Sequence, residues 1–181
     1  PIDPSKHYVF VANHISYLDI PLLFQAIRKN HFRVLGKIEM SKIPLFGLLY
    51  RIVVVLIDRS NSKSRKQSLV ELQKVLDQNI SIFIFPEGTF NEGRKPLKHF
   101  YDGAFRMAIE TQTPIKPIVF LDAVKLMHYK SIFSLRPGLS RAVHLPEISV
   151  EGYTPDDVAK LKNATFEAME ACILKYGGHY K

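Results

Sequence analysis

With 181 residues, 46% hydrophobic and 11% aromatic, the chain is not intrinsically disordered and is long enough for one domain with its own core. The formal net charge of +8 favours anionic partners such as phosphorylated substrates, a lipid surface or nucleic acid, although solubility alone explains it equally well. The single cysteine, Cys172, excludes an intrachain disulfide and indicates a reducing compartment, and in its helical context we expect it to pack rather than to react.

The first third of the chain alternates apolar runs with helical patterns. Residues 7–12 predict a buried strand, and apolar residues at helical spacing predict a helix over 19–29. A second strand is expected over 32–36, followed by a short helix or turn over 41–51. The continuous apolar run over 52–58 is typical of a strand that is covered on both faces.

The middle third continues this alternation. An amphipathic helix is predicted over 62–78 and a strand over 81–85. A long loop rich in Gly and Pro follows, and after it come a helix over 104–110 and a strand over 115–121.

The last third is irregular over 122–150, with one strand candidate at 142–144. The start signals of the final helix are Thr154, Pro155 and Asp157, and the helix is expected to end at Gly177–Gly178.

Alternating strands and helices place the chain in the α/β class, as a single layered αβα domain over residues 1–181 with a largely parallel mixed sheet. The longest apolar stretch, 43–57, is shorter than the roughly 20 residues of a membrane-spanning helix, and Arg51 interrupts it. No signal peptide or spanning segment is therefore predicted.

Polar clusters follow three of the predicted strands directly: Asn13–Asp19, Asp58–Arg59 and Pro86–Thr89. Domains of the α/β class bind ligands in loops at the carboxyl ends of their strands. We therefore expect the functional site where these three clusters meet.

His14 and Asp19 allow two interpretations. A histidine can accept a proton from an attacking hydroxyl, and a carboxylate on its other ring nitrogen fixes the tautomer and stabilises the imidazolium. Alternatively, His14 bonds a loop carbonyl while Asp19 caps the helix that follows. The HxxxxD spacing alone favours the second interpretation.

Arg59 also has two interpretations. The arginine fork suits a phosphate, with two charge-assisted hydrogen bonds, and the alternative is a surface ion pair with Asp58 or Glu39. Between residues 37 and 66 the sequence has seven Lys and Arg against two acids. A solvated helix face explains three of these cations but does not explain Arg59.

The segment "FPEGT" (85–89) predicts a tight turn after a strand. Gly88 allows a ligand to approach the backbone closely, and Glu87 can accept from a hydroxyl or hold a basic neighbour. An ordinary turn is the alternative. Nucleotide-binding glycine motifs are absent, as are CxxC and HExxH, so neither a nucleotide loop nor a metal site is predicted.

Taken in order, these clusters resemble the lysophosphatidic acid acyltransferase family, the PlsC-like 1-acyl-sn-glycerol-3-phosphate O-acyltransferases, over residues 8–121. Four blocks carry the resemblance: "NHISYLD" (13–19), "GKIEMSKIPLFGLLYRIVVVLIDR" (36–59), "FPEGT" (85–89) and "TPIKPIVF" (113–120). Four blocks in register are far more specific than any one of them.

The resemblance implies a set of roles. His14 would be the general base and Asp19 its partner. The phosphorylated acceptor would be bound by four residues, with Lys37 near the rim. These four are Arg59, Glu87, Gly88 and Thr89. The acyl donor would be a co-substrate, acyl-CoA or acyl-ACP, and the resemblance implies no metal, cofactor or covalent acyl-enzyme.

The implied reaction transfers a fatty acyl group from that thioester to the free hydroxyl of a lysophospholipid, 1-acyl-sn-glycerol-3-phosphate, which gives phosphatidic acid. One departure concerns the acceptor: the family usually has arginine or serine after the EGT turn, and here the residue is Phe90. The alternatives are acyl transfer to another lyso-lipid, a His-Asp esterase or thioesterase, and a non-catalytic module for anionic membranes.

The resemblance also implies a location. We expect a bacterial enzyme at the cytoplasmic face of the cell membrane, in contact with an anionic lipid surface and not with nucleic acid. The chain opens at Pro1, close to its first predicted strand, so the family's N-terminal membrane-binding helices would precede residue 1.

Overall fold

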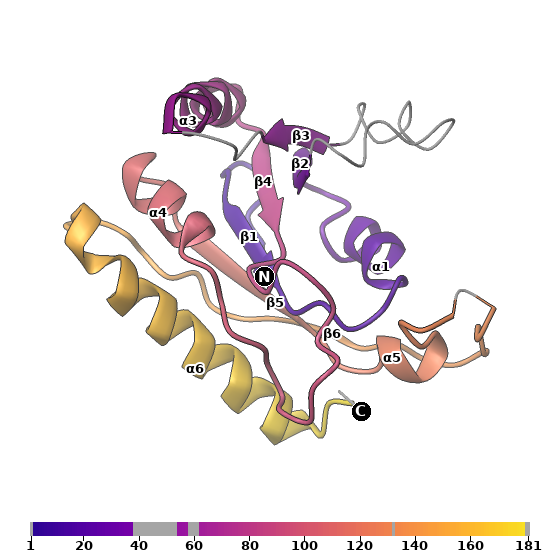
Figure 1. Cartoon of the computed structure of the whole chain (residues 1–181). Coiled ribbons are helices and arrows are strands. Elements are labelled where there is room, and N and C mark those ends of the chain that lie inside the picture. The colour runs from indigo at the N-terminus through magenta and orange to yellow at the C-terminus, as the bar shows by residue number, and fades with distance from the viewer. Residues whose placement is uncertain (1, 38–53, 58–61, 132, 180–181) are drawn as a thin grey trace.

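The computed structural model describes residues 2–37, 54–57, 62–131 and 133–179 (Figure 1). Six strands in these residues form one sheet, in the order β3-β2-β4-β1-β5-β6. Every neighbouring pair is parallel except β5 and β6, which are antiparallel. The strands are β1 (Val9–Ala12), β2 (Phe32–Lys37), β3 (Val54–Ile57), β4 (Ser81–Ile84), β5 (Ile115–Phe120) and β6 (Ala142–His144).

The predicted largely parallel mixed sheet is therefore confirmed. The expected short helix or turn over 41–51 and the two ends of the strand predicted over 52–58 lie outside the described residues.

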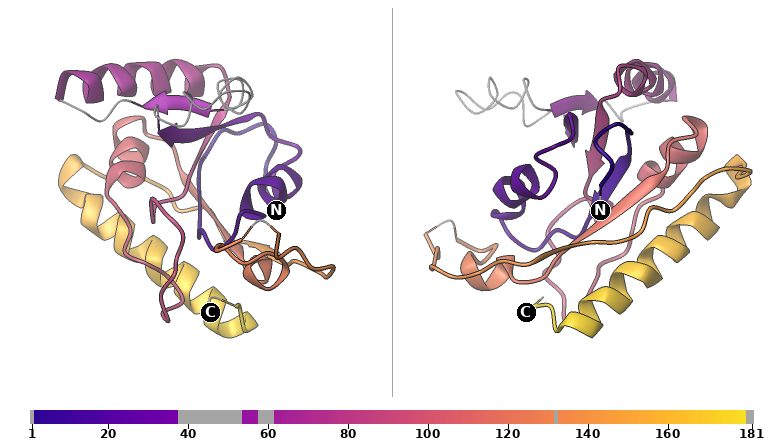
Figure 2. Two further views of the ribbon diagram at one scale, coloured as in Figure 1. Left: turned by 45° about the vertical axis from the view of Figure 1, so that its right-hand side comes forward. Right: turned by 180° about the vertical axis from the view of Figure 1, so that it is seen from behind.

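Helices cover both faces of this sheet, which confirms the three-layer αβα prediction (Figures 1 and 2). On one face lie α1 (Asp19–Ala26) and α5 (Ala123–Leu126). The other face carries α3 (Ser62–Asp77), α4 (Gly103–Glu110) and α6 (Val158–Tyr176), the last of which follows the 3-10 turn η2 (Pro155–Asp157).

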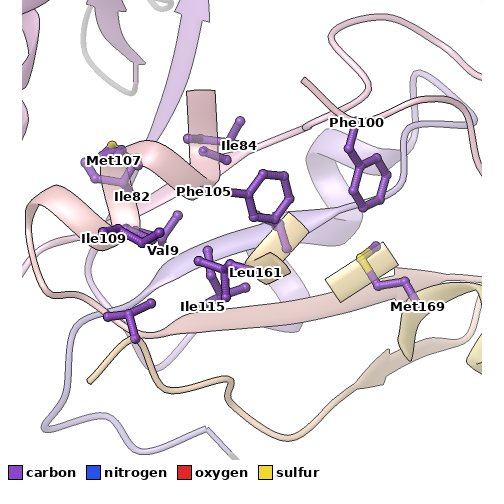
Figure 3. Close-up of a cluster of buried hydrophobic side chains, with 14 of the residues drawn as sticks. Val9, Ile82, Ile84, Phe100, Phe105, Met107, Ile109, Ile115, Leu161 and Met169 are labelled. Carbon is purple, nitrogen blue, oxygen red and sulfur yellow. The ribbon is translucent and has the colours of Figure 1, made fainter. Parts of the chain in front are cut away.

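The two-residue period of the strands divides the core into two clusters. Val9 of β1 points to the same side as Ile82 and Ile115 of the neighbouring strands, and there it packs with Phe105 of α4 and Leu161 of α6 (Figure 3). Fully burying such a side chain contributes about 1.5–3 kcal/mol relative to leaving it in water. Cys172 lies in the same cluster, as expected for a packing role.

The second cluster lies under α1. Phe10 of β1 points there with Phe83 of β4 and Phe120 of β5, and Leu23 of α1 and Ile27 close the cluster. Because β1 contributes to both clusters and all four of its residues are buried, its carboxyl end is held from both sides.

Between β5 and α6 the sequence was expected to be irregular apart from one strand. The strand at 142–144 is confirmed as β6, and the structure adds α5. A helix of four residues is too short for a 3.6-residue period to show in the sequence. The start and end signals of the last helix are also confirmed, by a capping box between Thr154 and Asp157 and by Gly177 in the left-handed conformation.

Candidate functional site

The candidate site lies where β1 and β4 end, because these parallel strands are neighbours in the sheet and their carboxyl ends meet. The amide of Asn13 fixes the first loop to β5: it donates to the Phe120 carbonyl at 2.9 Å and accepts from the Phe120 N–H at 2.8 Å. The N–H of Asn91 donates to the His14 carbonyl at 2.7 Å, which joins the loop after β4 to the loop after β1.

His14 and Asp19 form the pair that the catalytic interpretation requires. Nδ1 of His14 lies 2.8 Å from Oδ2 of Asp19, and the side chains are 17% and 0% exposed. An N–H at Nδ1 donates to the carboxylate, which leaves Nε2 with the lone pair. Nε2 is then the atom that can accept a proton from a substrate.

Asp19 begins α1 but does not cap it. Its Oδ2 accepts from the backbone N–H groups of Ile15 (2.7 Å) and Ser16 (2.9 Å) as well as from His14, so it fixes the loop that carries the histidine. Burial raises the pKa of Asp19, and its hydrogen bonds act in the opposite direction. Its Oδ1 is buried and has no hydrogen-bond partner among the described residues.

Glu87 supports the same loop from the side of β4. Its Oε1 accepts from the His14 N–H and its Oε2 accepts from the Lys98 N–H, each at 2.9 Å. The residue has no exposed surface. This arrangement makes Glu87 a residue that positions His14, whereas the sequence suggested that it contacts the acceptor. Direct contact between Glu87 and a substrate stays a prediction.

Among the described residues, no cationic side chain makes a hydrogen bond with the Glu87 carboxyl. Burial raises its pKa from 4.5 to about 7, although the two backbone N–H groups lower it. Asp19 raises it further through charge repulsion, since both carboxyls lie beside the His14 loop.

Two phenylalanines hold the imidazole ring. Phe85 stacks on it with ring centroids 3.9 Å apart and planes 15° apart, and Phe90 contacts it at 4.2 Å. Sequence reasoning did not assign a role to Phe85. The sequence pattern that could have indicated its position is the two-residue period of the strand, which places Phe85 on the same face as Phe83. Phe90 was noted only as a departure from the family.

The turn after Glu87 is exposed beside this pair. Gly88 has φ +70°, a conformation that favours glycine, and a Cβ there would lie 3.1 Å from the Tyr101 ring, which would have to shift slightly. Gly88 and Thr89 are exposed, which leaves their backbone and the Thr89 hydroxyl accessible to a ligand. Their predicted contacts with an acceptor are compatible with this placement but are not tested by it.

A sequence profile of the family described as Acyltransferase matches residues 1–121. The chain belongs to the acyltransferase family. It is 32% identical over 168 residues to 1-acyl-sn-glycerol-3-phosphate acyltransferase alpha of Mus musculus, covering 92% of this chain and 58% of that protein. It is 31% identical over 168 residues to 1-acyl-sn-glycerol-3-phosphate acyltransferase of Haemophilus influenzae, covering 91% and 68%.

The fold agrees with this membership. The crystal structure of the 1-acyl-sn-glycerophosphate (LPA) acyltransferase PlsC from Thermotoga maritima superposes with a TM-score of 0.77 at 22% identity, covering 100% of this chain and 70% of that one. The resemblance predicted from the four sequence blocks is thus confirmed at the level of family and fold. The chain spans less than two thirds of the length of the mouse relative.

The remaining predicted residues of this acyltransferase chain are only partly visible. Arg59 and the side chain of Lys37 lie outside the described residues, so their phosphate-binding roles stay predictions. Arg94 and Lys95, in the loop after the EGT turn, are described and exposed. In the described ranges no three His, Cys, Asp or Glu side chains are arranged to hold a metal ion, and no helix there is long and apolar enough to cross a membrane.

Proposed function

We propose that this chain transfers a fatty acyl group from an acyl thioester to the free hydroxyl of 1-acyl-sn-glycerol-3-phosphate, which gives phosphatidic acid. The observation that carries the proposal is the buried His14–Asp19 pair, with Nε2 left to face a substrate hydroxyl. The names of the mouse and Haemophilus influenzae relatives support this choice of acceptor.

The mechanism is direct transfer without an acyl-enzyme. Nε2 of His14 takes the proton of the acceptor hydroxyl as that oxygen attacks the thioester carbonyl carbon. The tetrahedral intermediate collapses, the carbon–sulfur bond breaks, and the imidazolium returns the proton to the departing thiolate. A positioned general base typically contributes about 10²–10⁴-fold to the rate.

Asp19 and Glu87 give His14 its geometry in this mechanism. Asp19 accepts from Nδ1 and stabilises the imidazolium that forms during attack. Glu87 fixes the backbone of His14, and Phe85 and Phe90 restrict the position of its ring. Thr89 and the exposed backbone of its turn are candidates for stabilising the oxyanion.

The substrates follow from the same proposal. The donor is acyl-CoA or acyl-ACP, and Arg59, with Lys37 near the rim, would bind the acceptor phosphate. The exposed Arg94 and Lys95 can assist, because Phe90 provides no charge at the position after the EGT turn. We place the reaction at an anionic membrane surface, on the cytoplasmic face of a bacterial membrane.

A second candidate is hydrolysis of the thioester by the same base, with water in place of the acceptor. The two reactions separate cleanly in an assay of the full-length protein that measures thiol release from acyl-CoA with and without lysophosphatidic acid. Acyl transfer predicts that thiol release requires the acceptor and equals the phosphatidic acid formed. Thiol release that proceeds at the same rate without acceptor would establish a thioesterase.

The acceptor itself is tested with Arg59→Ala. Its KM for lysophosphatidic acid should rise at least about tenfold, the value of one lost charge-assisted contact, while its KM for uncharged 1-acylglycerol stays unchanged. Arg106→Ala, on exposed helix α4 surface, is the matched control and should change neither. Equal effects on both acceptors would remove the phosphate-binding role and favour another lyso-lipid.

A further inference from the structure

Exposed hydrophobic side chains gather in one region of the surface. Of the ten large hydrophobic residues exposed among the described residues, six lie at the start of α1, on α1 or in the loop that follows α5. These six are Tyr17, Ile20, Phe24, Phe133, Leu135 and Leu139. Phe133 and Leu139 are each 91% exposed. Apolar side chains clustered in this way usually mark an interaction surface.

The loop presents these side chains through its own hydrogen bonds. The backbone N–H of His128 donates to Oγ of Ser134 at 2.8 Å, and the N–H of Arg136 donates to the Leu126 carbonyl at 2.7 Å. Gly138 lies against Leu126 so closely that a Cβ would be 2.5 Å from its side chain. The outward position of Phe133 is therefore built into the loop.

A groove of about 640 Å³ separates this loop from α1. Its apolar wall is formed by Leu18 and Leu22 on one side and by Leu135 and Leu139 on the other. Figures 1 and 2 show α1 and the loop side by side, on the face of the sheet opposite α6.

This surface is tied to the site of His14. The Ser16 hydroxyl, in the His14 loop, donates to the Met127 carbonyl at the start of the exposed loop. Tyr129 of that loop stacks on Phe90, which in turn contacts the His14 ring. A partner bound to the loop would therefore lie beside the candidate site.

The charge of the region is positive. The sequence contains no Asp or Glu between residues 20 and 38 or between residues 123 and 146. The exposed cations on these two segments are Arg28, Lys29, Arg33, Lys125, Lys130, Arg136 and Arg141, the last of which pairs with Asp122. Exposed apolar side chains on segments that carry cations and no acids are complementary to an anionic lipid leaflet, which offers an apolar interior under negative headgroups.

We propose that α1 and the described residues 127–131 and 133–140 of the loop after α5 form a docking surface for an anionic membrane. Phe133 and Leu139 enter the acyl region, and Lys130 and Arg136 contact the headgroups. Docking brings the groove and the His14 pair to the lipid surface, where a lysophospholipid can enter without crossing water. This last link rests on the function proposed above, whereas the docking itself rests on the surface alone.

The test is co-sedimentation of the full-length protein with two kinds of vesicle, pure phosphatidylcholine and phosphatidylcholine with phosphatidylglycerol in equal parts. The double variant Phe133→Ser/Leu139→Ser should lower partitioning onto the anionic vesicles about 100-fold, because two apolar side chains no longer enter the acyl region of the bilayer. The control is Val70→Ser/Leu174→Ser, two exposed hydrophobic residues on α3 and α6, which should leave partitioning unchanged.

Charge reversal tests the contribution of the cations to membrane binding. Lys130→Glu/Arg136→Glu should lower partitioning onto the anionic vesicles at least about tenfold and have little effect on pure phosphatidylcholine. Lys160→Glu/Lys175→Glu on α6 is the matched control, since it changes the net charge equally on the opposite face.

Binding by Phe133→Ser/Leu139→Ser at the wild-type level would overturn the proposal. So would a self-associating wild type whose association, and not its vesicle binding, is lost in that variant, because the occupant would then be a second copy of the chain. His14→Ala separates this proposal from the catalytic one. His14→Ala should bind vesicles as the wild type does, because docking does not use the imidazole. If the wild type binds vesicles but transfers no acyl group, the proposed function is wrong and the docking proposal stands.

Discussion

Three carboxylates that follow strands of the same sheet are stabilised in two opposite ways. Asp19 begins α1 after the loop that follows β1, and Glu87 lies in the loop after β4; both are buried, accept mainly from backbone N–H groups, and have raised pKa values. Asp122, directly after β5, accepts two hydrogen bonds from the Arg141 guanidinium at 2.7 and 2.8 Å, and this pairing lowers its pKa to about 2.

This difference separates a carboxylate with a structural role, Asp122, from the carboxyls beside the proposed catalytic base, His14. The Asp122 carboxylate is neutralised by Arg141 and is also contacted by His179 at 3.3 Å, so it ties β5 to the segment after α6. The carboxyls of Asp19 and Glu87 both bind the His14 loop, and among the described residues no guanidinium pairs with either of them. A proton that arrives on His14 is therefore stabilised by Asp19, as a general base requires.

The largest expected effect comes from Asp19→Asn. One oxygen of Asp19 accepts all three donors, so an asparagine can place its own oxygen there and keep the three hydrogen bonds. The negative charge is lost, and the NH₂ group takes the place of Oδ1, which is buried without a partner among the described residues. We expect kcat to fall about 10²–10⁴-fold while KM changes little. Asp122→Asn is the matched control and should retain wild-type kcat. A normal kcat in Asp19→Asn would remove the orienting role.

Glu87→Gln should act mainly on stability. Each Glu87 oxygen takes a different donor, so the amide must turn its NH₂ group towards one of two backbone N–H groups. We expect a loss of about 1–3 kcal/mol in the free energy of unfolding at acidic pH, together with a reduced kcat, because the His14 backbone is no longer fixed. Urea unfolding at pH 5 measures the first effect, and unchanged stability there would contradict the two-donor account.

The pH dependence of the stability difference between the wild type and Glu87→Gln tests whether Glu87 is protonated in the folded protein. The folded pKa of Glu87, about 7, lies above its ordinary 4.5, so its contribution is complete below pH 4.5 and is lost as pH rises through 7. The stability advantage of the wild type over Glu87→Gln should therefore shrink between about pH 4.5 and pH 7, by up to about 3 kcal/mol. An advantage that grows with pH would show that Glu87 is ionised throughout.

Asp122→Asn should have the smallest effect, with the opposite pH dependence. The lowered pKa means that its contribution is present above the ordinary value of 3.8 and is lost as pH falls through about 2. Because the Arg141 side chain is 50% exposed and screened by water, the expected loss at pH 7 is only about 1–2 kcal/mol. Thermal or urea unfolding at pH 7 and pH 3 measures it, and an equal deficit at both would exclude the ion pair as its source.

The sequence was sufficient for the layers of the fold and for the central pair. His14 and Asp19 are five residues apart, and the strands on which they depend are continuous apolar runs. Glu87 was recognised as a site residue, but its role was not, because its two donors, the N–H groups of His14 and Lys98, lie 73 and 11 residues away. The pairing of Asp122 with Arg141 was invisible for the same reason, since no local pattern links residues on either side of a loop.

The aromatic contacts around His14 show the same limit. Phe90 looked like a missing charge when it was compared with the family, and its contact with the imidazole depends on how the loop after β4 folds over the loop after β1. Long-range packing of this kind has no sequence period. Alternation and spacing therefore located the site, and only tertiary contacts distinguished residues that hold His14 from residues that face solvent.

The most direct test of the central claim is the rate of phosphatidic acid formation from acyl-CoA and lysophosphatidic acid by the wild type and His14→Ala. His99→Ala, an exposed histidine in the loop after β4, is the control. The account predicts that His14→Ala lowers kcat about 10²–10⁴-fold with unfolding unchanged, and that His99→Ala keeps the wild-type rate. Turnover by His14→Ala within a few-fold of the wild type would contradict the account.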